Sequence, residues 1–245
     1  MDETTPTNNA HFLRGQLLER LLAVEPEGVL DVGCGRGELL QLCKAGGLPA
    51  VGLEASRERA VLARSSGAAA IVASGEQLPF ADVSVPWVVM RHVAHHLGDP
   101  QRGVTEMARV AGQGVIVAEP HRPQDRAEQR TALAVDLWCK IHHRRQGHIH
   151  HPDVSAAEMV SWLRQAWGTA SDVQSDVQNN VQIDVHEVHR PALLPRATVQ
   201  ADLEAAVADL PRDHPEVQRV TEWLALADDT GVGATGSVIV VARRR

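Results

Sequence analysis

Three glycines alternate with other residues directly after a short apolar run that contains an acid. The stretch reads VLDVGCGRGELL, with Asp31 two residues before Gly33, followed by Gly35 and Gly37. Glycine tolerates positive φ and carries no Cβ, so the backbone can come close to a ligand there. A carboxylate beside such a loop favours a ligand with positive charge, such as an ammonium group. The pattern predicts a site for a small molecule with a cationic end.

The glycine spacing differs from that of the dinucleotide fingerprint. That fingerprint is GxGxxG, and the helix N-terminus that follows it receives a pyrophosphate. Here the spacing is GxGxG, and Glu38 stands where the third glycine of the fingerprint would fall. Asp31 also carries the wrong charge for a pyrophosphate. A nicotinamide-linked oxidoreductase is therefore the disfavoured alternative.

A second acid lies at the end of the next apolar run. Glu54 follows Asp31 by 23 residues, where an acidic side chain can accept two hydrogen bonds from a ribose diol. The two acids and the glycine spacing thus predict a ligand with a ribose, a cationic end and no pyrophosphate. S-adenosylmethionine fits this description.

The elements that position these residues alternate between helix and strand over the first 120 residues, which predicts a parallel, doubly wound sheet. Strands are expected at 28–32, 50–54, 69–72, 87–90 and 115–118, and helices at 12–22, 38–45, from 56, and at 100–110 after an Asp99 N-cap.

Four motifs in order resemble those of a known family. They are VLDVGCGRG, VGLEAS, SGEQLPFADVS and VAHHLGDPQRGVTEMARV, within residues 29–120. They resemble class I S-adenosylmethionine-dependent methyltransferases of the small-molecule, type 11 branch, which includes quinone-biosynthesis C-methyltransferases. The resemblance implies an α/β, Rossmann-like, mostly parallel seven-stranded sheet. It also implies methyl transfer to an oxygen, nitrogen or carbon of a small molecule, which leaves S-adenosylhomocysteine.

The resemblance assigns the methionine end of the cofactor to Asp31, Gly33 and Gly35, and the ribose to Glu54. It assigns the adenine to Ser74, Gly75 and Glu76. The further expected cofactor contacts are Cys34, Ala55 and Arg91.

Two departures from the family pattern keep another function open. Ser74 stands where the family commonly has Asp, and a neutral hydroxyl is a weaker acceptor. Residues 84–86 read Ser-Val-Pro where the family commonly reads SFD, so the fourth strand is expected to start at Trp87, after the proline. The alternative is a non-catalytic or regulatory protein that binds S-adenosylmethionine.

The second half of the chain predicts a helical cap built from late insertions. The expected division is a cofactor-binding core at 1–123, cap segments at 124–170 and 196–230, a core strand within 171–195, and a last core strand within 231–245. Ordinary packing is favoured over the lining of a pocket for four tryptophans of this half, Trp138, Trp162, Trp167 and Trp223.

The histidines form two clusters. In HVAHH, residues 92–96, the family turn is favoured over a metal site, and no metal is predicted. His92 and His121 lie near strand ends and are the candidate general bases.

The second cluster comprises His142, His143, His148, His150 and His151, with Cys139 upstream. Its loose spacing favours a solvated loop over a metal site or a substrate contact.

Composition limits the remaining classes. The net charge of −7 argues against a broad nucleic-acid interface, and the three cysteines lack disulfide spacing. The polar start shows no secretory signal, and no apolar run reaches membrane-spanning length. A cytoplasmic protein, monomeric or homodimeric, with a small-molecule methyl acceptor as its partner is expected.

Overall fold

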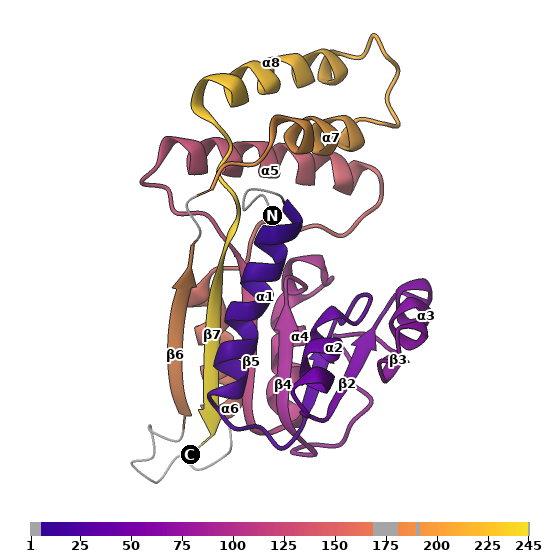
Figure 1. Ribbon diagram of the computed structural model, residues 1–245, viewed down its shortest axis with the longest axis vertical. Helices are drawn as coiled ribbons and strands as arrows, with labels where there is room; N and C mark the ends of the chain where they lie inside the picture. The colour runs from indigo at the N-terminus through magenta and orange to yellow at the C-terminus, as the bar shows by residue number, and fades with distance from the viewer. Residues whose placement is uncertain (1–5, 169–180, 190–191, 245) are drawn as a thin grey trace. The chain divides into compact units, whose positions relative to one another are not determined.

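The computed structural model describes residues 6–168, 181–189 and 192–244 (Figure 1). The chain divides into two compact units. The sheet unit comprises Arg14–Glu119, Val154–His186 and Val238–Arg245, and the helical unit comprises Met1–Leu13, Pro120–Asp153 and Glu187–Ser237.

Seven strands form one sheet in the order β3-β2-β1-β4-β5-β7-β6. Their bounds are β1 Val29–Val32, β2 Ala50–Glu54, β3 Ala70–Val72, β4 Val85–Arg91, β5 Ala111–His121, β6 Val181–Val188 and β7 Gly236–Arg244. The pairs β1/β2, β1/β4, β2/β3 and β4/β5 are parallel, and Figure 1 shows β7 pointing opposite to β6. The expected mostly parallel, doubly wound α/β sheet is confirmed.

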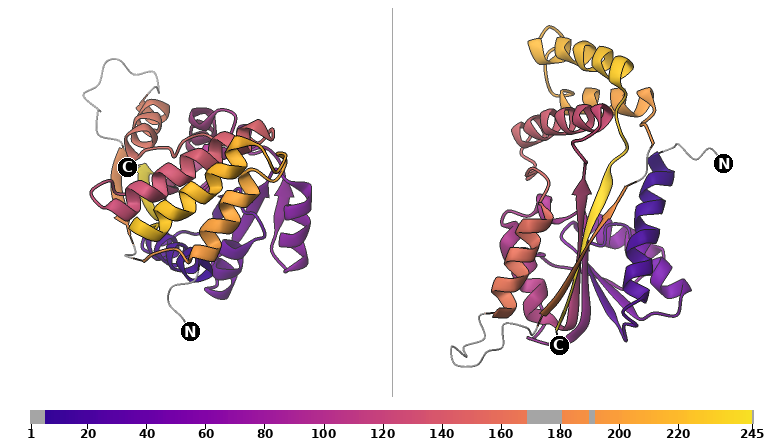
Figure 2. Two further views of the ribbon diagram at one scale, coloured as in Figure 1. Left: turned by 90° about the horizontal axis from the view of Figure 1, so that it is seen from above. Right: turned by 90° about the vertical axis from the view of Figure 1, so that its left-hand side faces the viewer.

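Helices cover both faces of the sheet. The bounds are α1 Pro6–Leu22, α2 Glu38–Ala45, α3 Arg57–Ser65, the short 3₁₀ helix η1 Ala94–His96, α4 Pro100–Val110 and α6 Ala156–Gly168. Figure 2 shows α4 and α6 on one face, with α1, α2 and α3 on the other. All four residues of β1 are buried, as expected for a central parallel strand.

Local sequence signals set the helix starts. The Ser56 side chain accepts from Arg59 N–H, and Asp99 accepts from Arg102 N–H ahead of Pro100, so the expected Asp99 N-cap is confirmed. Ser155 and Glu158 form the reciprocal hydrogen bonds of a capping box at the start of α6.

The fourth strand begins earlier than expected. β4 starts at Val85 rather than at Trp87. Val85 pairs with Ala111, whereas Trp87 pairs with Gly114, so an irregularity in the register accommodates Pro86. Because proline has no N–H to donate, the strand tolerates it at that irregularity.

Helix α6 belongs to the sheet unit, although the sequence placed residues 124–170 in the cap. Met159 and Leu163 are fully buried in the core of the sheet unit. Trp167 Nε1 also donates to Ala108 O at 2.8 Å. The apolar face of α6 therefore packs on the sheet. The spacing of apolar residues along a helix does not distinguish packing on the sheet from packing in a cap.

The helical unit consists mainly of three helices, α5 Ala127–Arg145, α7 Arg196–Ala206 and α8 Pro215–Thr230. Their core includes Trp138 and Leu203, with Trp223 packed against it. Trp138 Nε1 donates to Glu216 at 2.9 Å. The packing role favoured for Trp138 and Trp223 fits these contacts.

Part of the expected organisation falls outside the described residues. Residues 169–180 and 190–191 of the expected cap and core-strand segments lie there, as do residues 1–5 of the polar start. None of the helices in the described part of the chain combines the length and the apolar character that a membrane span requires.

The centre of the sheet gives the first prediction. A Cβ on Gly114 would lie 2.4 Å from ring carbons of Trp87 and 2.6 Å from Ala242 O. We expect Gly114→Ala to lower the free energy of unfolding by about 1 to 3 kcal/mol, because overpacking strains a closed core. Urea unfolding followed by circular dichroism measures this change.

Gly112→Ala, in the same strand, is the matched control. Its Cβ would meet Val85 O at 3.5 Å, which is ordinary van der Waals contact. Equal stability of the two variants would contradict the close packing around Gly114.

Candidate functional site

The glycine loop between β1 and α2 has the left-handed backbone that its sequence predicts. Gly33, Gly35 and Gly37 have φ of 74°, 59° and 86°. The Gly33 and Cys34 N–H groups donate to Leu53 O at 2.7 and 3.0 Å, and Gly37 N–H donates to Cys34 O at 2.9 Å. Because these amides already have partners within the protein, they are not available to a pyrophosphate. The loop suits a ligand without one.

Two of the glycines are needed for different reasons. A Cβ on Gly33 would lie 2.3 Å from Val93, so this glycine lets the loop pack against the turn after β4. At Gly35 the nearest atom to a Cβ would be Glu38 Oε2 at 4.0 Å, so this position adjoins open space. Gly35 therefore leaves room for a ligand.

Asp31 places a carboxylate almost out of solvent, with 4% of its surface exposed. Burial raises its pKa to about 7, and the negative charges of Glu38 and Glu54 add to this shift, while Arg91 opposes it. A cation beside Asp31 would stabilise its charged form. The electrostatics of the site therefore favour a ligand with a cationic group.

Glu54 ties the end of β2 to the glycine loop. Its Oε2 accepts from Gly35 N–H and its Oε1 accepts from Ser56 N–H, each at 2.9 Å. A carboxylate oxygen has two lone-pair sites, so each oxygen retains one acceptor position. Glu54 is 6% exposed and well held. The expected ribose diol can therefore still be accepted.

The segment expected at the adenine is also held by hydrogen bonds. Ser74 Oγ accepts from Glu76 N–H at 3.1 Å, and Glu76 Oε1 accepts from Gly98 N–H at 2.6 Å. A Cβ on Gly75 would lie 3.2 Å from Val32. These contacts place Ser74, Gly75 and Glu76 near the ends of β1 and β4.

The sheet register brings most of the expected cofactor residues together. Asp31 pairs with Gly52 on β2 and with Val89 on β4, so the carboxyl ends of three neighbouring strands adjoin. Those ends carry Gly33, Cys34 and Gly35 after β1, Glu54 and Ala55 at β2, and Arg91 with His92 at β4. Burial raises the pKa of Cys34 to about 12, which keeps its thiol protonated.

The two candidate bases lie in different units. His92 follows β4 in the sheet unit with φ of 53°, and its N–H donates to Ala118 O at 2.7 Å. His121 is in the helical unit, where its Nε2 lies 3.6 Å from Glu187. Their role as bases stays a prediction.

Glu119 is a positioning residue that the sequence reasoning missed. It is fully buried, and its Oε1 accepts from Val93 N–H at 2.9 Å and Ala94 N–H at 3.1 Å. Its Oε2 lies 2.6 Å from His95 Nδ1. Glu119 thereby holds the turn after β4. An acid at the end of the apolar run VIVAE was the available signal, because a buried carboxylate must find donors.

The second histidine cluster is not a solvated loop throughout, so that prediction is wrong for two members. Helix α5 continues to Arg145 and includes His142 and His143. His142 is buried, with its ring centroid 4.3 Å from that of Trp138. His143 Nδ1 lies 3.1 Å from His150 Nδ1. Both side chains lie on the face of α5 that packs toward the interior of the helical unit.

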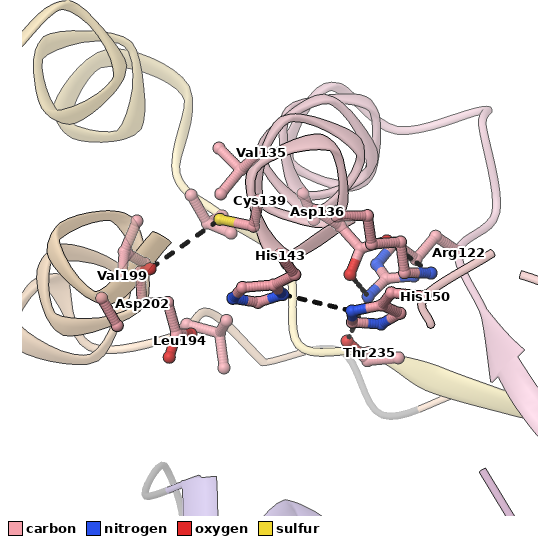
Figure 3. A pocket seen from close by; sticks show the side chains of 15 residues that line it. Arg122, Val135, Asp136, Cys139, His143, His150, Leu194, Val199, Asp202 and Thr235 are labelled. Atoms are coloured by element: carbon pink, nitrogen blue, oxygen red, sulfur yellow. Dashed lines mark hydrogen bonds and ion pairs between the residues drawn. The ribbon is translucent and has the colours of Figure 1, made fainter. Parts of the chain in front are cut away.

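A cavity of about 200 Å³ lies within the helical unit, and His143 and His150 line it (Figure 3). Arg122 Nη2 lies 3.1 Å from Asp136, whose second carboxylate oxygen lies 3.0 Å from Lys140 Nζ. Asp153 pairs with both of these cations. The ions beside the cavity are therefore largely compensated.

Residues 30–118 match the family described as "methyltransferase domain". The matched segment includes the glycine loop, Glu54, the segment at 74–76 and the turn after β4. It ends one residue before Glu119.

Curated relatives match the same part of the chain. Ajmaline N-methyltransferase from Rauvolfia serpentina is 32% identical over 117 residues, which are 43% of this chain and 40% of that protein. A methyltransferase from Mycobacterium sp. strain JLS is 42% identical over 88 residues, 35% of each protein. The matched segment thus spans less than half the length of these relatives.

A solved structure extends the likeness in fold beyond the methyltransferase domain. The crystal structure of the YcgJ protein from Bacillus subtilis aligns with a TM-score of 0.65 at 17% identity. The alignment covers 96% of this chain and 99% of that one. At this identity the likeness shows the fold alone.

Asp31 gives a prediction on stability against pH. A raised pKa means that folding favours the protonated carboxyl, so stability falls as pH rises from about 4 to about 7. Asp31→Asn lacks this penalty. At pH 8 we expect it to unfold with a free energy higher by on the order of 2 to 4 kcal/mol, with no such gain at pH 4.

Thermal unfolding of both proteins at several pH values measures this difference. Asp125→Asn, at an exposed site, controls for the loss of one charge. Parallel pH profiles of wild type and Asp31→Asn would show that Asp31 is not a destabilised buried acid.

Proposed function

We propose that the protein transfers the methyl group of S-adenosylmethionine to an oxygen, nitrogen or carbon atom of a small organic molecule. One observation carries the proposal. The carboxylate of Asp31 is buried beside a glycine loop in which the amides of all three glycines are already paired. Such a site suits a cationic ligand without a pyrophosphate. The match of residues 30–118 to the methyltransferase domain supports the same donor.

The residues present fit this donor. Asp31 would hold its ammonium group, Glu54 its ribose hydroxyls, and residues 74–76 its adenine. Gly33, Cys34, Gly35, Ala55 and Arg91 would complete the contacts. When bound, S-adenosylmethionine supplies a methyl group already activated by its sulfonium. The chain itself then has little covalent chemistry to perform.

The protein's task in this reaction is alignment. Holding the acceptor in line with the methyl group can contribute on the order of 7 to 11 kcal/mol to lowering the barrier. Glu119 contributes indirectly, because it fixes the turn after β4 beside the glycine loop. His92 or His121 would take up the acceptor's proton where the acceptor must lose one.

The relative from Rauvolfia serpentina is by its name an N-methyltransferase of ajmaline. This supports nitrogen as one of the acceptor atoms that a domain of this kind serves. The reaction and acceptor of the whole chain are proposals, because the matched segment covers under half of that relative.

Calorimetry tests the donor site directly. We expect S-adenosylmethionine to bind and NAD not to bind. Glu54→Ala should weaken donor binding about tenfold or more, because it removes charge-assisted hydrogen bonds to the ribose. Glu54→Gln keeps an oxygen acceptor and should lose less. Glu58→Ala, at an exposed position of α3, is the matched control.

Turnover separates an enzyme from a non-catalytic binding protein. With an acceptor present, for instance in a cell extract, the protein should release S-adenosylhomocysteine. Donor binding without any turnover would support the alternative raised by Ser74. Binding of NAD alone, or an unchanged donor affinity in folded Glu54→Ala, would overturn the proposal.

A further inference from the structure

The cavity of the helical unit has an apolar body. Val135 of α5 and Val199 of α7 line it, with Leu194 and Val232 from the segments that flank α7 and α8. Its volume of about 200 Å³ exceeds that of an engineered apolar cavity of about 150 Å³ that binds benzene. A ligand with one ring or a compact branched group therefore fits it.

Two imidazoles meet at one side of this cavity. The rings of His143 and His150 are parallel within 2°, with centroids 5.3 Å apart. Their Nδ1 atoms are only 3.1 Å apart, so the rings meet edge to edge, as the dashed line in Figure 3 shows. One Nδ1 must donate and the other must accept. If His143 donates, its Nε2 becomes an acceptor.

The surroundings of His143 favour its neutral form. Burial and the neighbouring His148 lower its pKa, against the opposing charges of Asp136 and Asp202. Figure 3 shows the far edge of its ring turned toward α7, the helix that carries Asp202. Among the residues that the structure describes, none shares a hydrogen bond with His143 Nε2.

Asp202 is the one charge beside the cavity that the surrounding ions do not compensate, within the described chain. Arg122 and Lys140 are matched by Asp136 and Asp153. No described residue donates a hydrogen bond to the Asp202 carboxylate, although its backbone O accepts from Cys139 Sγ at 3.9 Å. The charged residues of the lining, counted together with Asp153 that pairs with two of them, thus carry an excess of one negative charge.

We propose that this cavity binds a small primary amine with a compact apolar group, whose ammonium donates to the Asp202 carboxylate and to His143 Nε2. The apolar group lies against Val135, Val199 and Val232. A carboxylate ligand would place a second negative charge beside Asp202. An uncharged ligand would not offset that charge.

The binding site stands on the geometry of the helical unit alone. It is independent of the proposed donor contacts, which all lie in the sheet unit.

Ligand-observed NMR titrations with three isosteric probes test the binding site. We expect benzylamine to bind about tenfold or more tightly than benzyl alcohol or benzoate, as a charge-assisted hydrogen bond supplies that difference. Asp202→Asn should remove the preference for the amine. Val199→Trp should fill the cavity and abolish binding of all three probes.

Asp213→Asn is the matched control, because it removes one exposed aspartate of the same unit outside the cavity. It should bind benzylamine as the wild type does. Equal binding of the three probes, preference for benzoate, no binding at all, or an unchanged preference in Asp202→Asn would each overturn the inference.

Each variant is also titrated with S-adenosylmethionine. Loss of amine binding with intact donor binding refutes the cavity site only. Amine binding without donor binding refutes the proposed function only.

Discussion

A single buried charge sets the requirements of the proposed donor site. Asp31 lies on a central strand with its neighbours β2 and β4 in register on both sides, and little of it reaches solvent. A carboxylate in that environment is costly unless a partner offsets it. Arg91 offsets it in part, while Glu38 and Glu54 oppose this. The site is therefore built to be completed by a cation.

The backbone around Asp31 also favours a cationic ligand over an anionic one. The glycine loop folds back on Leu53 and Glu54, so its amides do not attract an anion. The absence of a side chain at Gly33 makes room for Val93 in the turn after β4. Glu119, on the neighbouring strand β5, holds that turn by hydrogen bonds. The donor site thus depends on three neighbouring strand ends whose positions the sheet register determines.

The sequence predicted the elements that local patterns control. The apolar runs, the glycine loop and the Asp99 cap predicted the order of strands and helices, and the motifs predicted the family whose domain residues 30–118 match. It did not predict the contacts of Glu119, because its partners lie over 20 residues away. It also misplaced α6, since an amphipathic helix packs equally well on a sheet or in a cap until the tertiary structure decides.

The helical unit shows the same limit. Arg122, Asp136, Lys140 and Asp153 are spread over 32 residues, and nothing in their spacing signals a compensated network. The sequence favours a loop for both His143 and His150, whereas α5 includes His143, and His150 lies in the loop after it with its Nδ1 3.1 Å from that of His143. Only the pairing of these four ions in the structure shows that Asp202 is an uncompensated charge beside an apolar cavity.

The most direct test of the central claim is the ionisation of Asp31 itself. The carboxyl ¹³C signal of Asp31, assigned by its absence in Asp31→Asn, is titrated with and without S-adenosylhomocysteine. This account predicts a pKa of about 7 in the free protein that falls by more than one unit when the ligand's ammonium binds. A pKa that stays unchanged or rises on binding would contradict it.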